Sequence, residues 1–205
     1  MKNIITFPSN LFKSKIRQKV LGLFFTNPKS RYYVRQLQSM FQVSVGSLHR
    51  ELKHLEEIGI LKSERQGNLK FYFTNTDYPL FNELKGIVSK TIGVEGSLRK
   101  VLKDIVGISV AFIYGSFASG KETGRSDVDL FLIGEFDEDL LNKKLRSLEQ
   151  YLAREITYTS MKKSEFKEEK QKKFKFLRMV LNEPKLFLIG DENELQKLSN
   201  PTLFN

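Results

Sequence analysis

Two short segments of this sequence hold residues that could bind a phosphorylated ligand together with a metal ion. Gly115-Ser116 ends an apolar run, and Asp127 and Asp129 follow after a loop. In an extended strand the side chains alternate between faces, so the two aspartates point the same way and repel each other unless a cation bridges them. Glycine lets the backbone approach a phosphate closely, and the serine adds a hydroxyl donor. The two segments therefore predict a site for a triphosphate and a divalent cation, and magnesium fits best.

The elements that must position these residues form a mixed set of strands and helices. The apolar run over residues 108–114 predicts a buried strand that ends at the glycine, and residues 126–133 predict a second strand that carries both aspartates. An amphipathic helix is expected over residues 137–151, followed by a third strand over residues 154–159. The pattern indicates a small mixed α/β domain with the chemistry at its strand ends.

The spacing of the two segments resembles a known family signature. Gly115-Ser116, ten residues and then Asp127-Val128-Asp129 resemble the motif of the DNA polymerase beta-like nucleotidyltransferase superfamily, and of its minimal nucleotidyltransferases most closely. The resemblance covers about residues 97–190. It implies that Gly115 and Ser116 bind the β- and γ-phosphates of a nucleoside triphosphate, and that Asp127 and Asp129 ligate Mg²⁺ in a two-metal site.

The chemistry that this resemblance implies is nucleotidyl transfer. An acceptor hydroxyl attacks the α-phosphorus of the nucleoside triphosphate, and pyrophosphate leaves. Minimal nucleotidyltransferases include antitoxins that modify a partner protein, which makes a protein the first acceptor class. Antibiotic-modifying relatives make a small-molecule hydroxyl the second.

The family pattern also implies a third carboxylate on a neighbouring strand. Glu155 is our candidate, and it shares a predicted strand face with Thr157 and Thr159. If Thr157 instead takes the central position of this strand in the site, the site keeps its metal but loses the base that would activate the acceptor hydroxyl. Lys121 and Arg125 lie in the loop between the two motifs, where they could reach triphosphate oxygens or serve as ordinary loop charges.

Positive charge is concentrated in the first part of the chain. Residues 1–78 hold 13 lysines and arginines against 5 acidic residues, whereas residues 79–205 hold 21 against 19. An excess confined to one segment predicts that this segment binds a polyanion such as nucleic acid. A merely basic protein with no such partner is the alternative.

The same segment shows the element order of a known DNA-binding fold. Helices are predicted over residues 13–26, 34–41 and 44–58, followed by a hairpin with strands at 61–65 and 69–74. This order resembles the winged helix-turn-helix of ArsR- and MarR-like transcription regulators. The resemblance implies a homodimer that binds double-stranded DNA with its third helix in the major groove, although winged helices also serve as protein-binding or dimerisation modules.

The DNA contacts expected from this resemblance lie on the third helix and the hairpin. Arg50 and His49 are the expected base readers, and the other polar residues suit phosphate oxygens. The full set is Ser44, Ser47, His49, Arg50, Lys53, Arg65, Gln66, Asn68 and Lys70.

Composition excludes several other classes of protein. The chain has no cysteine, so it has no disulfide, thiolate zinc site or cysteine nucleophile. No apolar run approaches the roughly 20 residues needed to span a bilayer, and the opening segment lacks the apolar stretch of a signal peptide. We therefore expect a soluble cytoplasmic protein that has no membrane partner.

Together these patterns predict an α+β protein of two domains. A winged helix is expected over residues 1–78, a helical connector over 79–96 and a small mixed α/β nucleotidyltransferase fold over 97–205. The leading interpretation is a DNA-binding regulator that carries a magnesium-dependent nucleotidyltransferase. The rival is a pure regulator whose degenerate second domain binds a nucleotide as an effector.

Overall fold

A computed structural model describes residues 12–122, 126–172 and 175–199. Arg125, one of the two loop cations named above, lies outside these ranges. The chain forms two compact units: residues 1–97 with 150–153 make one, and residues 98–149 with 154–205 make the other.

Helices and a three-stranded sheet build the first unit. Its elements are α1 (Lys15–Thr26), β1 (Arg31–Tyr33), α2 (Val34–Phe41), α3 (Val45–Glu57), β2 (Leu61–Gln66), β3 (Leu69–Thr74) and α4 (Phe81–Thr91). The helices and strands predicted up to residue 74 are thereby confirmed within two residues at their ends. The Ser44 side chain accepts the Ser47 amide and caps α3, and Gly59 follows the helix with a φ of 81°.

The core of this unit decides which face of α3 remains exposed. Leu48, Leu52 and Leu55 of α3 are buried against α1 and against the sheet, whose strand order is β1-β3-β2. Their burial leaves the polar side of α3 in solvent. Helix α4 joins the same core, because Phe81 stacks on Phe25 with ring centroids 5.7 Å apart. Most of the segment predicted as a connector, residues 79–96, thus packs into the first unit.

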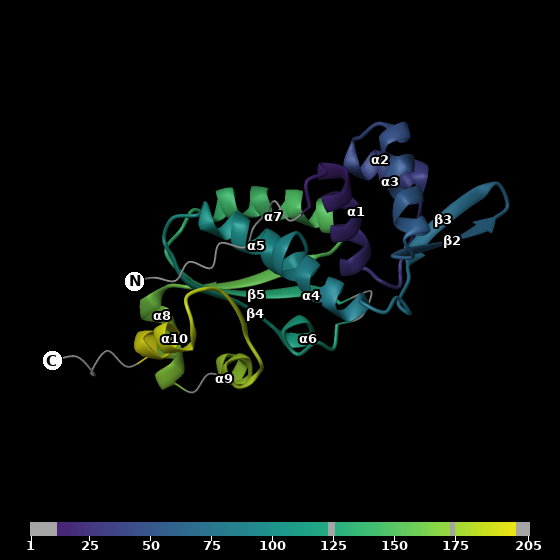
Figure 1. The fold of residues 1–205 in the computed structure, drawn as a ribbon. Helices are drawn as coiled ribbons and strands as arrows, with labels where there is room; N and C mark the ends of the chain where they lie inside the picture. The colour runs from purple at the N-terminus through teal and green to yellow at the C-terminus, as the bar shows by residue number, and fades with distance from the viewer. Residues whose placement is uncertain (1–11, 123–125, 173–174, 200–205) are drawn as a thin grey trace. The chain divides into compact units, whose positions relative to one another are not determined.

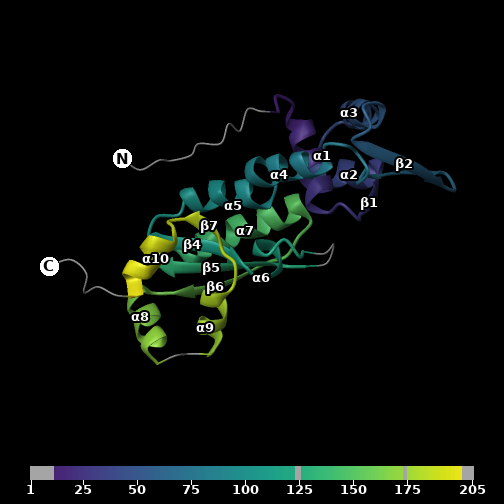
Figure 2. The same cartoon turned by 60° about the horizontal axis from the view of Figure 1, so that its bottom comes forward.

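Strands β4 to β7 and the helices around them follow. These elements are α5 (Val94–Lys103), β4 (Ile108–Tyr114), α6 (Gly115–Ala118), β5 (Val128–Gly134), α7 (Glu138–Leu152), β6 (Ile156–Met161), α8 (Lys163–Gln171), α9 (Lys175–Asn182), β7 (Leu186–Ile189) and α10 (Glu192–Ser199). The sheet has the order β6-β5-β4-β7, with β5 and β6 parallel and the other pairs antiparallel. Helix α7 covers one face of the sheet, and α8 and α9 cover the other (Figures 1 and 2).

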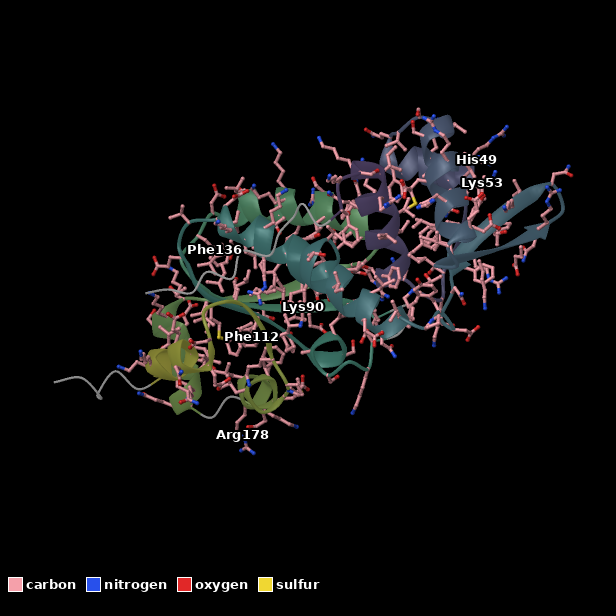
Figure 3. All side chains as sticks on the ribbon, viewed as in Figure 1. His49, Lys53, Lys90, Phe112, Phe136 and Arg178 are labelled. Atoms are coloured by element: carbon pink, nitrogen blue, oxygen red, sulfur yellow. The ribbon has the colours of Figure 1, made fainter. Side chains whose placement is uncertain are left out.

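Aromatic packing on the α8 and α9 side holds the two central strands together. Phe112 of β4 stacks on Phe131 of β5 with ring centroids 5.3 Å apart, and neither side chain is exposed to solvent. Phe112 is labelled in Figure 3. Tyr114, two residues further along β4, shares this face and lies opposite Asp129 in the strand register. The end of β4 therefore meets the beginnings of β5, β6 and β7 at one edge of the sheet.

Within the described ranges, none of the helices has both the length and the apolar character needed to cross a membrane.

Candidate functional site

The glycine turn at the end of β4 brings its backbone against Asp129. Gly115 has a φ of 70°, a left-handed conformation that glycine adopts without the strain of a side chain. A Cβ atom at this position would lie only 2.7 Å from Oδ2 of Asp129. Glycine therefore permits the carboxylate and the turn to approach closely, and the two predicted motifs meet.

Local hydrogen bonds fix the turn that contains Ser116. The Ser119 hydroxyl donates to the carbonyls of Gly115 and Ser116 at 2.9 and 3.2 Å, and the Lys121 amide donates to the Ser116 carbonyl at 2.9 Å. Ser116 is half-buried and the Lys121 side chain is exposed. The backbone carbonyls of this turn are thus occupied from within the turn itself.

The two aspartates lie at the start of β5. Asp127 immediately precedes the strand and is exposed, whereas Asp129 is its second residue and is half-buried. Burial raises the pKa of Asp129, the hydrogen bond from Thr157 lowers it, and the negative charges of Asp127 and Glu183 raise it further. The pKa of Asp129 is raised overall. No cationic side chain in the described part of the chain forms an ion pair with either aspartate.

Strand β6 places a threonine, not a carboxylate, beside Asp129. The parallel register pairs Asp129 with Thr157, whose hydroxyl donates to Oδ1 of Asp129 at 3.3 Å. Glu155 is exposed and precedes β6, where its main-chain carbonyl accepts the Val128 amide at 2.9 Å. Thr157 is therefore the β6 residue that pairs with Asp129 in the register. The role of Glu155 as a third carboxylate stays a prediction.

A carboxylate that sequence reasoning missed reaches the glycine turn from the other side. Oε2 of Glu183 accepts the Gly115 amide at 3.1 Å. Its charge also acts on Tyr114, whose pKa is raised by burial first and by Asp129 and Glu183 in addition. Glu183 lies between α9 and β7, and it reaches the site because β7 pairs with β4. A carboxylate before an apolar strand is the only sequence signal, and that signal is weak without the strand order.

Arg154 is a second residue that the motif search missed. Its side chain is buried, and Nη1 donates to the Ser126 carbonyl at 2.7 Å. The guanidinium carbon also lies 5.3 Å from the centre of the Phe117 ring. Since Ser126 precedes Asp127 and Phe117 follows Ser116, one buried cation links both segments of the site.

The residues at this edge fit a divalent cation that is shared with a ligand. Within the described ranges no three histidine, aspartate or glutamate side chains gather closely enough to hold a metal by themselves. Magnesium is commonly held by one or two carboxylates, with phosphate and water oxygens in the remaining positions. Asp127 and Asp129, which lack an ion-pair partner among the described residues, supply that donor set.

The residues predicted to contact DNA lie on the outer face of α3 and on the β2–β3 hairpin. His49, Arg50 and Lys53 are exposed, and Figure 3 labels His49 and Lys53 on this helix. Ser44 is exposed as well, and Ser47 is half-buried. Lys53 lies 3.6 Å from a Glu57 carboxylate oxygen on the same exposed face. Helix α3 therefore presents cations and hydroxyls together.

The four predicted DNA contacts on the β2–β3 hairpin differ in their exposure to solvent. Arg65, Gln66 and Asn68 are exposed around its turn. Lys70 is half-buried instead, because its ammonium forms a 2.7 Å ion pair with Glu56 and lies over the Tyr72 ring. Hydrogen bonding to Glu56 is the main cause of the raised pKa of Lys70. Of the four predicted hairpin contacts, Lys70 thus forms an ion pair within the protein, and the exposed Gln66 side chain donates to Oε1 of Glu64 at 2.8 Å.

Comparison with known proteins identifies one part of the chain. Residues 97–193 match the family model described as "Polymerase beta, Nucleotidyltransferase". No curated protein matches the sequence. Two crystal structures of toxin-antitoxin proteins are similar to it, and each match covers 53% of this chain and 83% of the other chain. The first, a toxin-antitoxin with AMP-PNP, has 15% sequence identity and a TM-score of 0.37. The second, a mutant of the toxin-antitoxin MntA-HpeT, has 13% sequence identity and a TM-score of 0.39. By its family match, the segment over residues 97–193 is a polymerase beta-like nucleotidyltransferase domain.

Proposed function

We propose that this protein is a DNA-binding regulator whose nucleotidyltransferase domain transfers a nucleoside monophosphate from a triphosphate to an acceptor hydroxyl. The observation that carries the enzymatic half is the contact between the Gly115 turn and Asp129. It joins a segment suited to phosphate with an aspartate pair suited to a cation, inside a segment that matches a nucleotidyltransferase family.

The residues of the chain bind and orient the reactants in this proposal. Gly115 and Ser116 hold the β- and γ-phosphates, and Asp127 and Asp129 hold Mg²⁺. When bound, the metal neutralises charge on the triphosphate and on the attacking oxygen. A bond forms between the acceptor oxygen and the α-phosphorus, and the bond from that phosphorus to the bridging oxygen breaks. Pyrophosphate leaves with the electron pair, and the hydroxyl proton passes to a nearby carboxylate or to water.

Transfer of a labelled nucleotide tests the proposal. The purified chain is incubated with Mg²⁺, each α-labelled nucleoside triphosphate and cell lysate, beside the Asp127→Asn, Asp129→Asn double variant. We expect label to appear on an acceptor only with the intact aspartates, and size separation then distinguishes a protein acceptor from a small molecule. Labelling of equal strength by both forms would refute the assignment of the aspartates.

One observation favours a second function, in which the domain binds nucleotide but transfers nothing. Thr157 stands beside Asp129 where a third carboxylate would complete the site. A domain without that base could still serve as a nucleotide sensor, provided that the nucleotide binds one DNA-affinity state better than the other. Nucleotide binding with no transfer, together with a change in DNA affinity on adding nucleotide, would favour this function.

Three features of the first unit support the DNA-binding half of the proposal. Its elements run helix, strand, helix, helix and hairpin, as in a winged helix-turn-helix. Helix α3 buries its leucines and exposes His49, Arg50 and Lys53. Residues 1–78 also carry most of the excess positive charge. A polar, cationic helix face in a basic segment suits the major groove and its flanking phosphates. A homodimer on paired half-sites follows from the same proposal.

Base reading and phosphate contact are separable by substitution on α3. On an operator selected from random duplexes, Arg50→Ala should weaken specific binding by roughly 1–3 kcal/mol and relax the preference at one base pair. Lys53→Ala should instead lower the slope of log affinity against log salt by about one unit. Lys29→Ala, an exposed cation in the turn before β1, serves as the charge-matched control and should leave base preference unchanged. Equal behaviour of all three variants would contradict the placement of α3 in the groove.

A further inference from the structure

Glu183 occupies the amide on which the proposed phosphate site depends. Its Oε2 accepts the Gly115 N–H at 3.1 Å, so a carboxylate already takes the donor that an incoming phosphate oxygen needs. The other side of the same glycine is bordered by the Asp129 carboxylate, whose Oδ2 lies 2.7 Å from the position of a Cβ atom. Gly115 is thus enclosed between two carboxylates.

The backbone around Glu183 holds the carboxylate in this place. The Glu183 amide donates to the Met179 carbonyl at 3.2 Å, continuing the hydrogen bonding of α9. The Lys185 ammonium, which is 8% exposed, donates to the carbonyls of Leu181 and Glu183 at 2.6 and 3.1 Å. Pro184 restricts the chain between them. The contact with Gly115 is therefore made by a side chain whose main chain is fixed from both sides.

The three carboxylates at this point form no ion pair with a described side chain. No lysine or arginine in the described ranges forms an ion pair with Asp127, Asp129 or Glu183. Lys185, the nearest cation in sequence, reaches the Glu183 main chain and lies 4.0 Å from Glu192. A bare triphosphate would have to displace one carboxylate beside two others, and each like charge raises the cost of that exchange.

We propose that Glu183 makes triphosphate binding at Gly115 depend on a divalent cation. The carboxylate holds the Gly115 amide in the free protein, and a cation-bound triphosphate displaces it whereas the free anion does not. This selectivity rests on the proposed function, because it requires the phosphate site at Gly115 and the cation at Asp127 and Asp129. It gives Glu183 a role in choosing the metal complex of the nucleotide over the free nucleotide.

Calorimetric binding of inorganic tripolyphosphate, with Mg²⁺ or with EDTA, tests the proposal without any turnover. Glu183→Gln keeps an oxygen for the Gly115 amide but removes the charge. We expect its affinity in EDTA to rise about tenfold, and its affinity with Mg²⁺ to change less than about threefold. Glu135→Gln removes the same charge from an exposed side chain that follows the other end of β5, and it should leave both affinities unchanged.

A second variant and a second readout keep the test decisive if Glu183→Gln folds poorly. Glu183→Asp keeps the charge but is one methylene shorter, so it should release the Gly115 amide and raise the affinity in EDTA about threefold. In wild-type protein the ¹⁵N-labelled Gly115 amide resonance should shift on adding tripolyphosphate with Mg²⁺ and stay in place with EDTA. If the resonance also shifts when tripolyphosphate is added with EDTA, the free anion displaces Glu183 and the proposal is overturned.

The remaining outcomes separate this inference from the proposed function. Unchanged dependence on Mg²⁺ in Glu183→Gln, or weaker binding under both conditions, would overturn the role of Glu183 and leave the phosphate site intact. Absence of tripolyphosphate binding by wild type under both conditions would refute the phosphate site itself, and this role of Glu183 with it.

Discussion

Replacing Asp129 by asparagine is expected to slow nucleotidyl transfer by about three orders of magnitude, which corresponds to about 4 kcal/mol in the activation barrier. Asp129 faces the glycine turn and is the better oriented of the two aspartates, because the Thr157 hydroxyl holds one of its oxygens. An amide is neutral and offers a single weak oxygen ligand, so the variant should lose most of its affinity for Mg²⁺. Single-turnover transfer at one fixed Mg²⁺ concentration, which saturates wild type, measures the loss.

The same substitution is expected to leave the metal-free protein at least as stable as wild type at pH 7. Burial, together with the charges of Asp127 and Glu183, raises the pKa of Asp129 above its ordinary value of 3.8. A carboxyl whose pKa is higher in the folded state binds protons more tightly there, so the free energy of unfolding rises as pH falls from neutral through that raised value. The asparagine side chain of the variant cannot titrate, and wild type should therefore gain more stability than the variant between pH 7 and pH 4.

Thermal unfolding in EDTA over this pH range checks the stability half of the prediction. Asp139→Asn is the matched control, because Asp139 is exposed in the first turn of α7. It should leave transfer within about twofold of wild type and its pH dependence of stability unaltered. Transfer by Asp129→Asn above a tenth of the wild-type rate would contradict the metal-binding role of this carboxylate.

Truncating Phe112 to alanine is expected to destabilise the sheet that carries the site by about 3–5 kcal/mol. The ring is fully buried, stacks on Phe131 and lies 5.5 Å from the ring of Phe187. Removing it leaves a cavity between β4, β5 and β7, which are the three strands that bring Gly115, Asp129 and Glu183 together. Urea unfolding followed by far-ultraviolet circular dichroism measures the effect, since the chain has no tryptophan.

Two further variants separate cavity formation from a general loss of apolar surface. Phe112→Leu keeps most of the volume and should cost less than about 1.5 kcal/mol. Val106→Ala removes apolar atoms from a side chain that is 90% exposed and should change stability by no more than about 0.5 kcal/mol. A cost below about 1 kcal/mol for Phe112→Ala would contradict the aromatic packing described above.

Local sequence patterns predicted the elements and the central part of the site. The alternation and apolar runs located β4 and β5, and Gly115 and Asp129 each follow from their place at a strand end. These features depend on neighbours within a few residues, which a sequence displays directly. The short helix α6, which begins at Gly115, follows from the same turn.

The rest of the site depends on how distant strands are ordered and aligned. Glu155 and Thr157 share one face of a strand, so alternation cannot decide between them, and only the parallel register shows that Thr157 stands beside Asp129. Glu183 is 68 residues from Gly115 and reaches it only because β7 lies next to β4. Arg154 belongs to no sequence motif, because its place in the site depends on contacts with Phe117 and Ser126, which lie in other segments of the chain.

The strand order β6-β5-β4-β7 also bears on how readily this site tolerates mutation. Asp129 lies in the inner strand β5 and the glycine turn directly follows the inner strand β4, so a residue changed there disturbs neighbours on both sides. Thr157 and Glu183 belong to the outer strands or their approaches, which have fewer neighbours to accommodate. Under the proposed function, substitutions of these two residues would change which nucleotide complex binds, or the rate of transfer, while the sheet stays folded. Changes in activity are therefore most compatible with a stable fold at the outer strands β6 and β7 and in the segments that precede them.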